Sequence, residues 1–516
     1  MSGGTDRRGF LSRVGRLGAA LGLGGLGATG VVSRRASSAS IGSRARTGPC
    51  PAPGAVTGAD LVDVDRLWHW VEQMVDLGPR ITGNRAHRRY LDFLHDRLDS
   101  SGLHVIRYPV PLDEWQARSW SLHVVDARRE RHTIPVAFYR PHSGETAARG
   151  VTATVVDIGA GRDADYAGRD VQGRIVLADW SIPNLTAAVW TTVADYVHPP
   201  SIAEELSHEP FARIWLGIPE PPDLALAKQH GAVAMIDVLD QSTPLARGQF
   251  SPHQQDHVGL PALHLDRAQG ERLRGLMARG PLEATLVLDA RVRRTTVDYL
   301  GATLHGSGSL PGSLLLMTHT DGQNGTEENG GPALLALARY LTNLPRRCRP
   351  RDVTLLFSPN HMTSTASTLK PDTWLRQHPE ILQPVAMALV AEHLGALAWD
   401  DDPVTGRYRA SGYSELAAIP VGNSEVLKRV AIEEVQAADL RRAAVVRPRE
   451  GGLYGEGTFA YRLGVPTIAF ITGPSYLVQV TDDGDLDKLD RHLMHEQLVF
   501  LARVLSRMLN LPSARP

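Results

Sequence analysis

Four short apolar runs between residues 295 and 510 most constrain the fold of this chain. Each run has the length of a buried strand and is followed at once by polar residues. The runs are residues 314–317, 353–357, 385–391 and 467–471, and the polar residues that follow them are THTD, SPNH, EH and TGPSY. This pattern predicts the α/β class, with an open, mixed but mostly parallel sheet flanked by helices. Because ligands bind at the carboxyl ends of strands in such sheets, we expect these polar residues to form a site.

The residues before this region divide into two parts. The first part is predicted to hold helices at about residues 67–77 and 85–100, followed by short strands at 103–108 and 119–125. The second part, residues 150–290, is rich in short β-type runs separated by Gly and Asp turns. Within it, residues 183–222 hold seven prolines and are predicted to form a long inserted loop that shapes a neighbouring site.

Composition excludes some functions. The chain has 516 residues and a formal net charge of -1, so it has no basic field for nucleic acid. Its only cysteines, Cys50 and Cys348, are too few for a zinc ribbon or a disulfide framework. A bound metal would therefore be held by His, Asp and Glu side chains.

The amino terminus has the order of an export signal. Arg7 and Arg8 are followed by Phe10 and Leu11, and then by a weakly apolar, glycine-rich stretch at residues 17–32. This order resembles a twin-arginine signal, here predicted at residues 1–39 and followed by a linker at 40–57. The alternative is a basic tail. The signal predicts an extracellular, periplasmic or cell-envelope protein without stable membrane insertion after cleavage, because no run is long and apolar enough to span a bilayer.

Four residues after the first apolar run can carry chemistry. His319 and Asp321 lie two residues apart at a strand end, so their side chains leave on the same face. One can bind a metal while the other orients it, although a strand end with a surface aspartate gives the same pattern. Glu327 and Glu328 follow and are predicted to open a helix, where the helix dipole also favours acidic residues.

Two further strand ends supply His361 and Glu392, and His393 follows Glu392 directly. Convergence of these strand ends with His319 and the two adjacent glutamates would give nitrogen and oxygen ligands suited to zinc. We therefore expect one or two zinc ions, held by His319, Glu327, His361 and Glu392. The glutamate of the Glu327-Glu328 pair that is not a ligand is the expected general base.

Several longer segments carry a family resemblance. The segments are LGPRITGNRAHRRYLDFLHDRLDSSGLHV at residues 77–105, TTVDYLGATLHG at 295–306, LLLMTHTDG, ENGGPALLALARYL and GVPTIAF. They resemble the di-zinc aminopeptidase family, which includes bacterial leucyl aminopeptidases, glutamate carboxypeptidase and glutaminyl cyclase. DYAGRDVQGRIVLADW and ALAKQHGAVAMIDV resemble a protease-associated domain. The resemblance implies an aminopeptidase-like α/β domain at residues 58–130 and 293–516, with a protease-associated domain inserted at 131–292.

The resemblance also implies roles for single residues. His319 matches a zinc ligand, and Asp321 matches the residue that supports it, which places Asp321 in the catalytic group with Glu327 and Glu328. The family's bridging aspartate falls on Thr326, so Glu327 or Glu328 is expected to substitute for it.

Three family positions differ in this chain. The Glu-Glu pair that supplies the base and a ligand falls on Asn360 and His361, and the next aspartate falls on Glu392. A late histidine expected at residues 476–480 is absent, and Glu456 is the acidic residue that is a candidate to compensate.

These observations favour an exported, metal-dependent hydrolase of aminopeptidase type, which cleaves a peptide or small amide through a metal-activated water. Two alternatives stay open. One is a catalytically lapsed peptidase scaffold that acts as a binding protein, because Asn360 has no titratable group. The other is a single-zinc, cyclase-like enzyme of the same fold.

Overall fold

The computed structural model describes residues 49–514, except for residues 219, 251–256 and 364–369. The described residues all belong to the unit Ala45–Pro516. The predicted signal peptide lies outside the described residues. Within the described part of the chain, no helix is long and apolar enough to cross a membrane.

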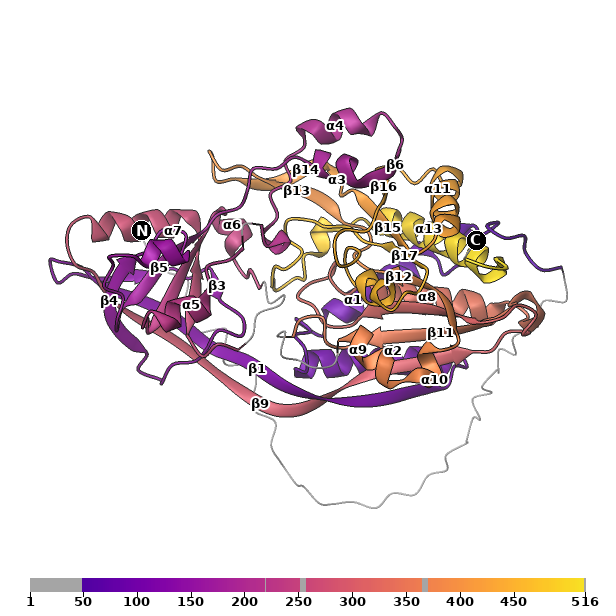
Figure 1. The fold of residues 1–516 in the computed structure, drawn as a ribbon, viewed down its shortest axis with the longest axis horizontal. Coiled ribbons are helices and arrows are strands. Elements are labelled where there is room, and N and C mark those ends of the chain that lie inside the picture. Colours follow the sequence, from indigo (N-terminus) through magenta and orange to yellow (C-terminus); the bar gives the residue numbers. More distant parts are fainter. Residues whose placement is uncertain (1–48, 219, 251–256, 364–369, 515–516) are drawn as a thin grey trace, which may run out of the picture. The chain divides into compact units, whose positions relative to one another are not determined.

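A mixed sheet forms the centre of the structure, as the sequence predicts (Figure 1). Its parallel strands are β11 (Asp352–Ser358), β10 (Ser313–His319), β12 (Val385–Ala391) and β17 (Thr467–Phe470), in that order. The sheet continues through β15 (Ala417–Gly422), β16 (Ala443–Val446) and β6 (Ala194–His198). The first four strands match the four predicted apolar runs, with β17 ending one residue earlier than predicted, and the predicted fold class is confirmed.

The helices of this region bury their apolar faces in one hydrophobic core with the sheet. They include α1 (Val64–Val75), α2 (Arg85–Ser100), α8 (Gly330–Asn343), α9 (Pro371–Gln377), α10 (Pro379–Leu382), α11 (Glu425–Ala437), α12 (Gly457–Arg462) and α13 (Arg491–Asn510). The caps of α1 and α2 are Asp63 and Asn84, whose side chains accept backbone N–H groups.

Helix α8 begins later than the sequence predicts. Glu327 and Glu328 lie in a turn before Gly330 and not in the first helical turn. The Asn324 side chain holds this turn because its Oδ1 accepts the backbone N–H groups of Thr326 and Glu327. The prediction that the two glutamates open the helix is therefore wrong.

The strands predicted at residues 103–108 and 119–125 are one continuous strand. Strand β1 (Val105–Val125) pairs antiparallel with β9 (Glu283–Leu304) along its length, with one register shift between Ala117 and Ser119 (Figure 1). Pro109 and Pro111 lie between the two predicted strands. They lie in a part of β1 that pairs with β9 alone, so the other side of the strand needs no N–H donor there.

A second set of strands forms the far part of the sheet. The order is β3 (Phe138–Tyr139), β8 (Ala262–Leu265), β7 (Ala234–Leu239), β5 (Ile175–Trp180), β4 (Val151–Asp157) and then β9. Helices α5 (Leu224–Gln229), α6 (Thr243–Ala246) and α7 (Arg267–Met277) belong to this part, and β2 (Arg131–Ile134) pairs with β1. The predicted boundary between residues 292 and 293 falls inside β9.

The segment at residues 182–218, which covers most of the loop predicted at 183–222, is structured. It holds α3 (Ala188–Val193), β6, α4 (Ile202–His208) and the 3-10 turn Ile214–Leu216. Strand β6 pairs antiparallel with β16 of the central sheet, and Trp190 shares a core with Leu416 and Ala418. The prolines suggested a loop because they stand between these short elements, as Pro199 and Pro200 do between β6 and α4.

The two cysteines form a single disulfide between Cys50 and Cys348. It ties the start of the described chain to a 3-10 turn, Arg346–Cys348, that follows α8. One crosslink is not a disulfide framework, but the sequence spacing of 298 residues gave no sign of the pairing.

Candidate metal centre

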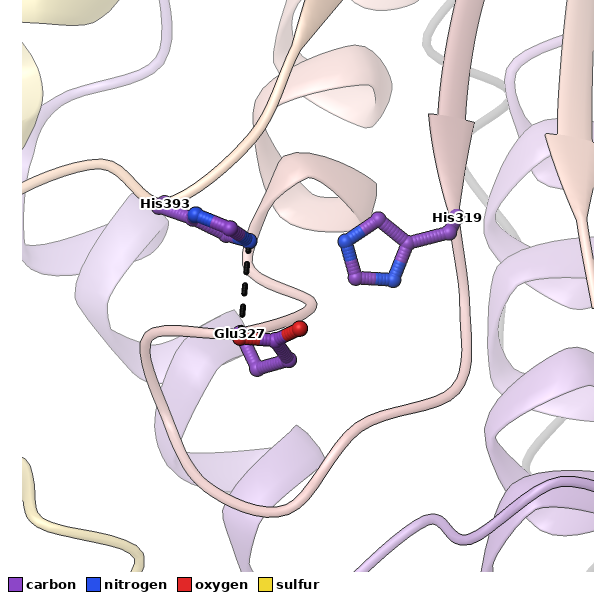
Figure 2. A group of neighbouring side chains, drawn as sticks. All are labelled: His319, Glu327 and His393. Carbon is purple, nitrogen blue, oxygen red and sulfur yellow. Dashed lines mark ion pairs between the residues drawn. The ribbon is translucent and has the colours of Figure 1, made fainter. Parts of the chain in front are cut away.

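The carboxyl ends of three neighbouring strands bring a group of His and Glu side chains together. His319 ends β10, His361 follows β11, and Glu392 and His393 follow β12. Glu327 reaches the same place from the turn before α8, and Figure 2 shows its carboxylate between the rings of His319 and His393. The structure therefore brings together all four residues that the sequence assigned as metal ligands.

The His319 ring is oriented by the backbone. Its Nδ1 donates to the carbonyl of Asp321 at 3.0 Å. Its Nε2 is buried, has no hydrogen-bond partner among the described residues and lies 3.5 Å from Glu392 Oε2. The expected support from Asp321 thus comes through its main-chain oxygen.

His393 is oriented in the same way. Its Nδ1 donates to the carbonyl of Thr472 at 2.9 Å, and its buried Nε2 lies 3.5 Å from Glu327 Oε2. His393 has a φ of 59°, in the left-handed region that non-glycine residues rarely adopt. Thr472 Oγ1 donates to the His393 carbonyl and holds this conformation.

His361 has a carboxylate as its partner. Its Nδ1 bonds Glu456 Oε1 at 2.8 Å, and its Nε2 lies 3.3 Å from Glu327 Oε1. The His361 and His319 rings stack with their centroids 4.1 Å apart. The two oxygens of Glu327 therefore face two different imidazoles.

Burial and mutual charge shift the pKa values of this group. Burial opposes the charged form of His319, but the nearby carboxylates of Glu392, Glu327 and Glu456 outweigh it and raise the pKa of His319 to about 10. Burial raises the pKa of Glu327 well above its usual value, and neighbouring carboxylates add to the rise. Burial lowers the pKa of His393 to about 4, which keeps this imidazole neutral at pH 7. The buried carboxylates thus favour a positive charge at this place. His393 stays neutral, which is the form of an imidazole that binds a metal.

These residues fit a metal ion by their chemistry. Ligand atoms of His319, Glu327 and His393, all buried, lie within 4.8 Å of one another. In metal sites the second ring nitrogen of a ligating histidine is usually bonded to a carbonyl or carboxylate, as it is here in all three imidazoles. Imidazole nitrogens with carboxylate oxygens form a donor set that suits zinc.

The other two carboxylates named from the sequence point elsewhere. Glu328 is buried and forms an ion pair with the Arg80 guanidinium. Asp321 accepts hydrogen bonds from Thr82 and from the backbone N–H groups of His361 and Met362, the latter two at 3.0 and 2.8 Å. Asp321 therefore fixes the loop that carries His361.

Asn360, which the resemblance in sequence places at the position of the general base, is also buried. Its Oδ1 accepts from Tyr299 at 3.1 Å and from Ser358 at 3.2 Å. Lys370 Nζ donates to the Asn360 carbonyl at 2.8 Å.

Two residues of the centre were not assigned as ligands or catalytic groups from the sequence. His393 was noted beside Glu392 but was not included among the ligands, and in the structure its left-handed backbone places its ring next to Glu327. Glu456 was noted only as a compensating acid, and it bonds His361. Its Oε2 has no hydrogen-bond partner in the described part of the chain, and burial with nearby charges raises the pKa of Glu456 to about 8.

A pocket of about 450 Å³ opens beside these residues. The pocket is lined by residues of the centre, namely Glu327, His361, Glu392, His393 and Glu456. Its walls include side chains from residues 190–216 and from 449–462.

The fold is similar to solved structures of bacterial peptidases. A peptidase M28 precursor from Shewanella amazonensis has a TM-score of 0.62 and 16% identity, over 88% of this chain and 97% of that chain. An aminopeptidase from Aneurinibacillus sp. strain AM-1 has a TM-score of 0.58 and 15% identity, over 89% of this chain and 97% of that chain. BSAP, a zinc aminopeptidase from Bacillus subtilis, has a TM-score of 0.57 and 14% identity, over 86% of this chain and 94% of that chain. No protein-family model and no curated protein matches the chain. The similarity establishes a shared fold.

Proposed function

We propose that this chain is a zinc-dependent hydrolase of aminopeptidase type that cleaves a peptide or amide bond. One observation carries the proposal. Three imidazoles have Nδ1 held by an oxygen and Nε2 directed at buried glutamates. The shared fold supports it, since one protein of that fold is a zinc aminopeptidase.

We assign His319, His393, Glu327 and Glu392 to one zinc ion. The first three have ligand atoms within 4.8 Å of one another, and Glu392 Oε2 lies 3.5 Å from His319 Nε2 and 3.8 Å from His393 Nε2. Glu327 Oε1 faces His361 Nε2, so these two residues form the start of a second metal position. In this assignment Glu327 takes the place of the bridging aspartate, and His393 supplies the imidazole that residues 476–480 lack.

Zinc at such a site acts as a Lewis acid toward the carbonyl of the scissile bond. We assign Glu456 to accept at Oε2 the proton that the attacking water releases, because this oxygen is buried at the pocket without a partner among the described residues. The charge of a bound zinc ion would lower the pKa of Glu456 from about 8, so that the carboxylate is ionised before it takes this proton. Glu456 Oε1 holds the His361 ring at the same time. Glu328, paired with Arg80, is assigned to position the turn that presents Glu327.

The test combines metal analysis with hydrolysis of a panel of aminoacyl and N-acyl amides. The wild-type protein should hold stoichiometric zinc, His393→Ala should lose most of it, and Glu456→Gln should keep zinc but lose turnover. His305→Ala is the control, because the His305 side chain is exposed and, among the described residues, pairs with Asp352 alone, at the opposite end of β11. A folded wild-type protein that binds no transition metal and cleaves no substrate would overturn the proposal.

A binding protein on a lapsed peptidase scaffold is the second candidate. The observation that favours it is Asn360, a buried amide held by Tyr299 and Ser358 at the position that the resemblance gives to the base. Zinc binding without hydrolysis, together with recovery of hydrolysis in the double variant Asn360→Glu/His361→Glu, would support this candidate.

We further propose export by the twin-arginine route. The Cys50–Cys348 disulfide supports an oxidising compartment, since disulfides persist outside the reducing cytosol. Replacing Arg7 and Arg8 with lysine should leave the precursor inside the cell, and continued secretion would contradict the assignment.

A further inference from the structure

The pocket beside the metal centre has an aromatic wall that comes from the segment at residues 182–218. Trp190 and Trp215 of this segment line the pocket together with Tyr454 and Phe459 of the central part. Trp190 packs edge-on against Tyr454, with ring centroids 5.0 Å apart. The wall thus offers flat apolar faces to a bound group.

Several contacts fix this wall in place. Arg213 pairs with Glu415 at 2.8 Å, and both side chains are buried. Arg213 Nε also donates to the Gly473 carbonyl at 2.9 Å, and Trp215 Nε1 donates to the Pro474 carbonyl at 2.9 Å. The Trp215 indole is therefore held by its own hydrogen bond to Pro474 and by the contacts of Arg213, two residues earlier in the chain.

Two arginines line the same pocket. Arg449 Nε donates to the Leu453 carbonyl at 3.1 Å, and Arg462 Nε donates to the Gly451 carbonyl at 2.8 Å. Neither guanidinium forms an ion pair with a carboxylate of the described residues. Both are exposed, so their terminal nitrogens are placed to meet an anion that enters with a ligand.

The carboxylates of the pocket are committed to the metal centre. Glu327 and Glu392 face imidazoles, and Glu456 bonds His361. Among the described residues that line the pocket, a free amino group of a substrate would find no carboxylate outside the centre, whereas a free carboxylate would find two guanidinium groups.

We propose that the pocket selects an aromatic amino-acid residue with a free carboxylate, as in an N-acyl aromatic amino acid or a peptide with an aromatic carboxyl-terminal residue. The aromatic wall contacts the ring, and Arg449 and Arg462 contact the carboxylate. This inference rests on the metal-dependent hydrolysis of the proposed function, because it places the acyl bond of that residue at the metal centre. It narrows the substrate from one recognised by a free amino group to one recognised by a free carboxylate.

The test measures binding to the zinc-loaded full chain by tryptophan fluorescence and calorimetry. The probes are N-acetylphenylalanine, its carboxyl amide, N-acetylalanine and phenylalaninamide. N-acetylphenylalanine should bind about three- to tenfold tighter than its amide, as is typical of exposed charge pairs that gain hydrogen bonds. Arg449→Gln and Arg462→Gln should each reduce this ratio, and Trp215→Leu should reduce the preference for phenylalanine over alanine.

Arg441→Gln is the matched control, since Arg441 is exposed just before β16 and does not line the pocket. It should leave every ratio unchanged, and thermal unfolding checks that each variant is folded. Equal binding of the acid and its amide, or tighter binding of phenylalaninamide, would overturn the inference. If amides are hydrolysed without such a preference, the inference fails and the proposed function stands. If the acid is preferred but no metal binds and nothing is cleaved, the proposed function fails and the assignment of the pocket stands.

Discussion

Replacing Glu328 with glutamine tests whether this residue is the general base that the sequence predicts or the counter-ion that the structure shows. In the structure Glu328 is 0% exposed and Arg80 is 1% exposed, and the two form an ion pair. The Arg80 guanidinium also donates to the carbonyls of Met74, Gly78 and Asn324. Burial lowers the pKa of Arg80 to about 10, which leaves it charged at pH 7. Glu328 is therefore the counter-ion of a buried cation.

The size of the effect follows from these partners. Breaking a buried ion pair by removing one partner costs about 3–5 kcal/mol. In Glu328→Gln the guanidinium keeps three carbonyl acceptors, so we expect a loss near the lower end, about 3 kcal/mol. In Arg80→Met the Glu328 carboxylate stays buried without its cation and three carbonyls lose a donor, so we expect about 5 kcal/mol or more.

Urea unfolding in the presence of a chelator measures this loss without a contribution from zinc. The double variant Arg80→Met/Glu328→Leu should be more stable than Arg80→Met, because it leaves no unpaired charge. If Glu328→Gln unfolds at the wild-type urea concentration but abolishes hydrolysis with zinc retained, Glu328 is the general base and our assignment is wrong.

Three further outcomes are expected. Zinc at about a thousand times its Kd should stabilise the wild-type protein by about 4 kcal/mol, and His393→Ala should lose most of this gain in thermal unfolding; an equal gain would remove His393 from the centre. Replacing Cys50 and Cys348 with serine should lower the free energy of unfolding by roughly 2–5 kcal/mol, and an unchanged urea midpoint would show that the disulfide is dispensable. Burial raises the pKa of Glu415 from the ordinary 4.5 to about 7, so its contribution to stability is complete below pH 4.5 and is lost as the pH rises through 7. Relative to Glu415→Gln, the wild-type protein should lose about 3 kcal/mol across this window, and a constant difference would contradict the shift.

The four central strands could be predicted because each is an uninterrupted apolar run that ends in polar residues, whereas their order in the sheet was not predicted. Strand ends alone were enough to bring His319, His361 and Glu392 together, since neighbouring parallel strands end at one edge of the sheet. Strand β1 was predicted as two short strands, although it is continuous. Sequence rules treat proline as a strand break, because they cannot tell which side of a strand is paired.

The roles within the centre could not be separated in the same way. Glu327 and Glu328 are identical adjacent residues, and only the position of Arg80, more than two hundred residues earlier, directs one away from the imidazoles. His393 enters the centre through a single backbone angle that no residue pattern encodes.

The ribbon of β1 and β9 has a consequence for the order of folding during synthesis. Val125 pairs with Glu283 at one end and Val105 pairs with Ala302 at the other. The residues enclosed between Val125 and Glu283 must leave the ribosome before the first of these pairs can form. Strand β11 also pairs with β9, and β10 pairs with β11. The strands that precede His361 and carry His319 therefore assemble beside β9, which is itself paired with the much earlier residues of β1. Such non-local pairing raises contact order and slows folding. We therefore expect closure of this ribbon to set the rate at which the metal centre is assembled on a newly made chain.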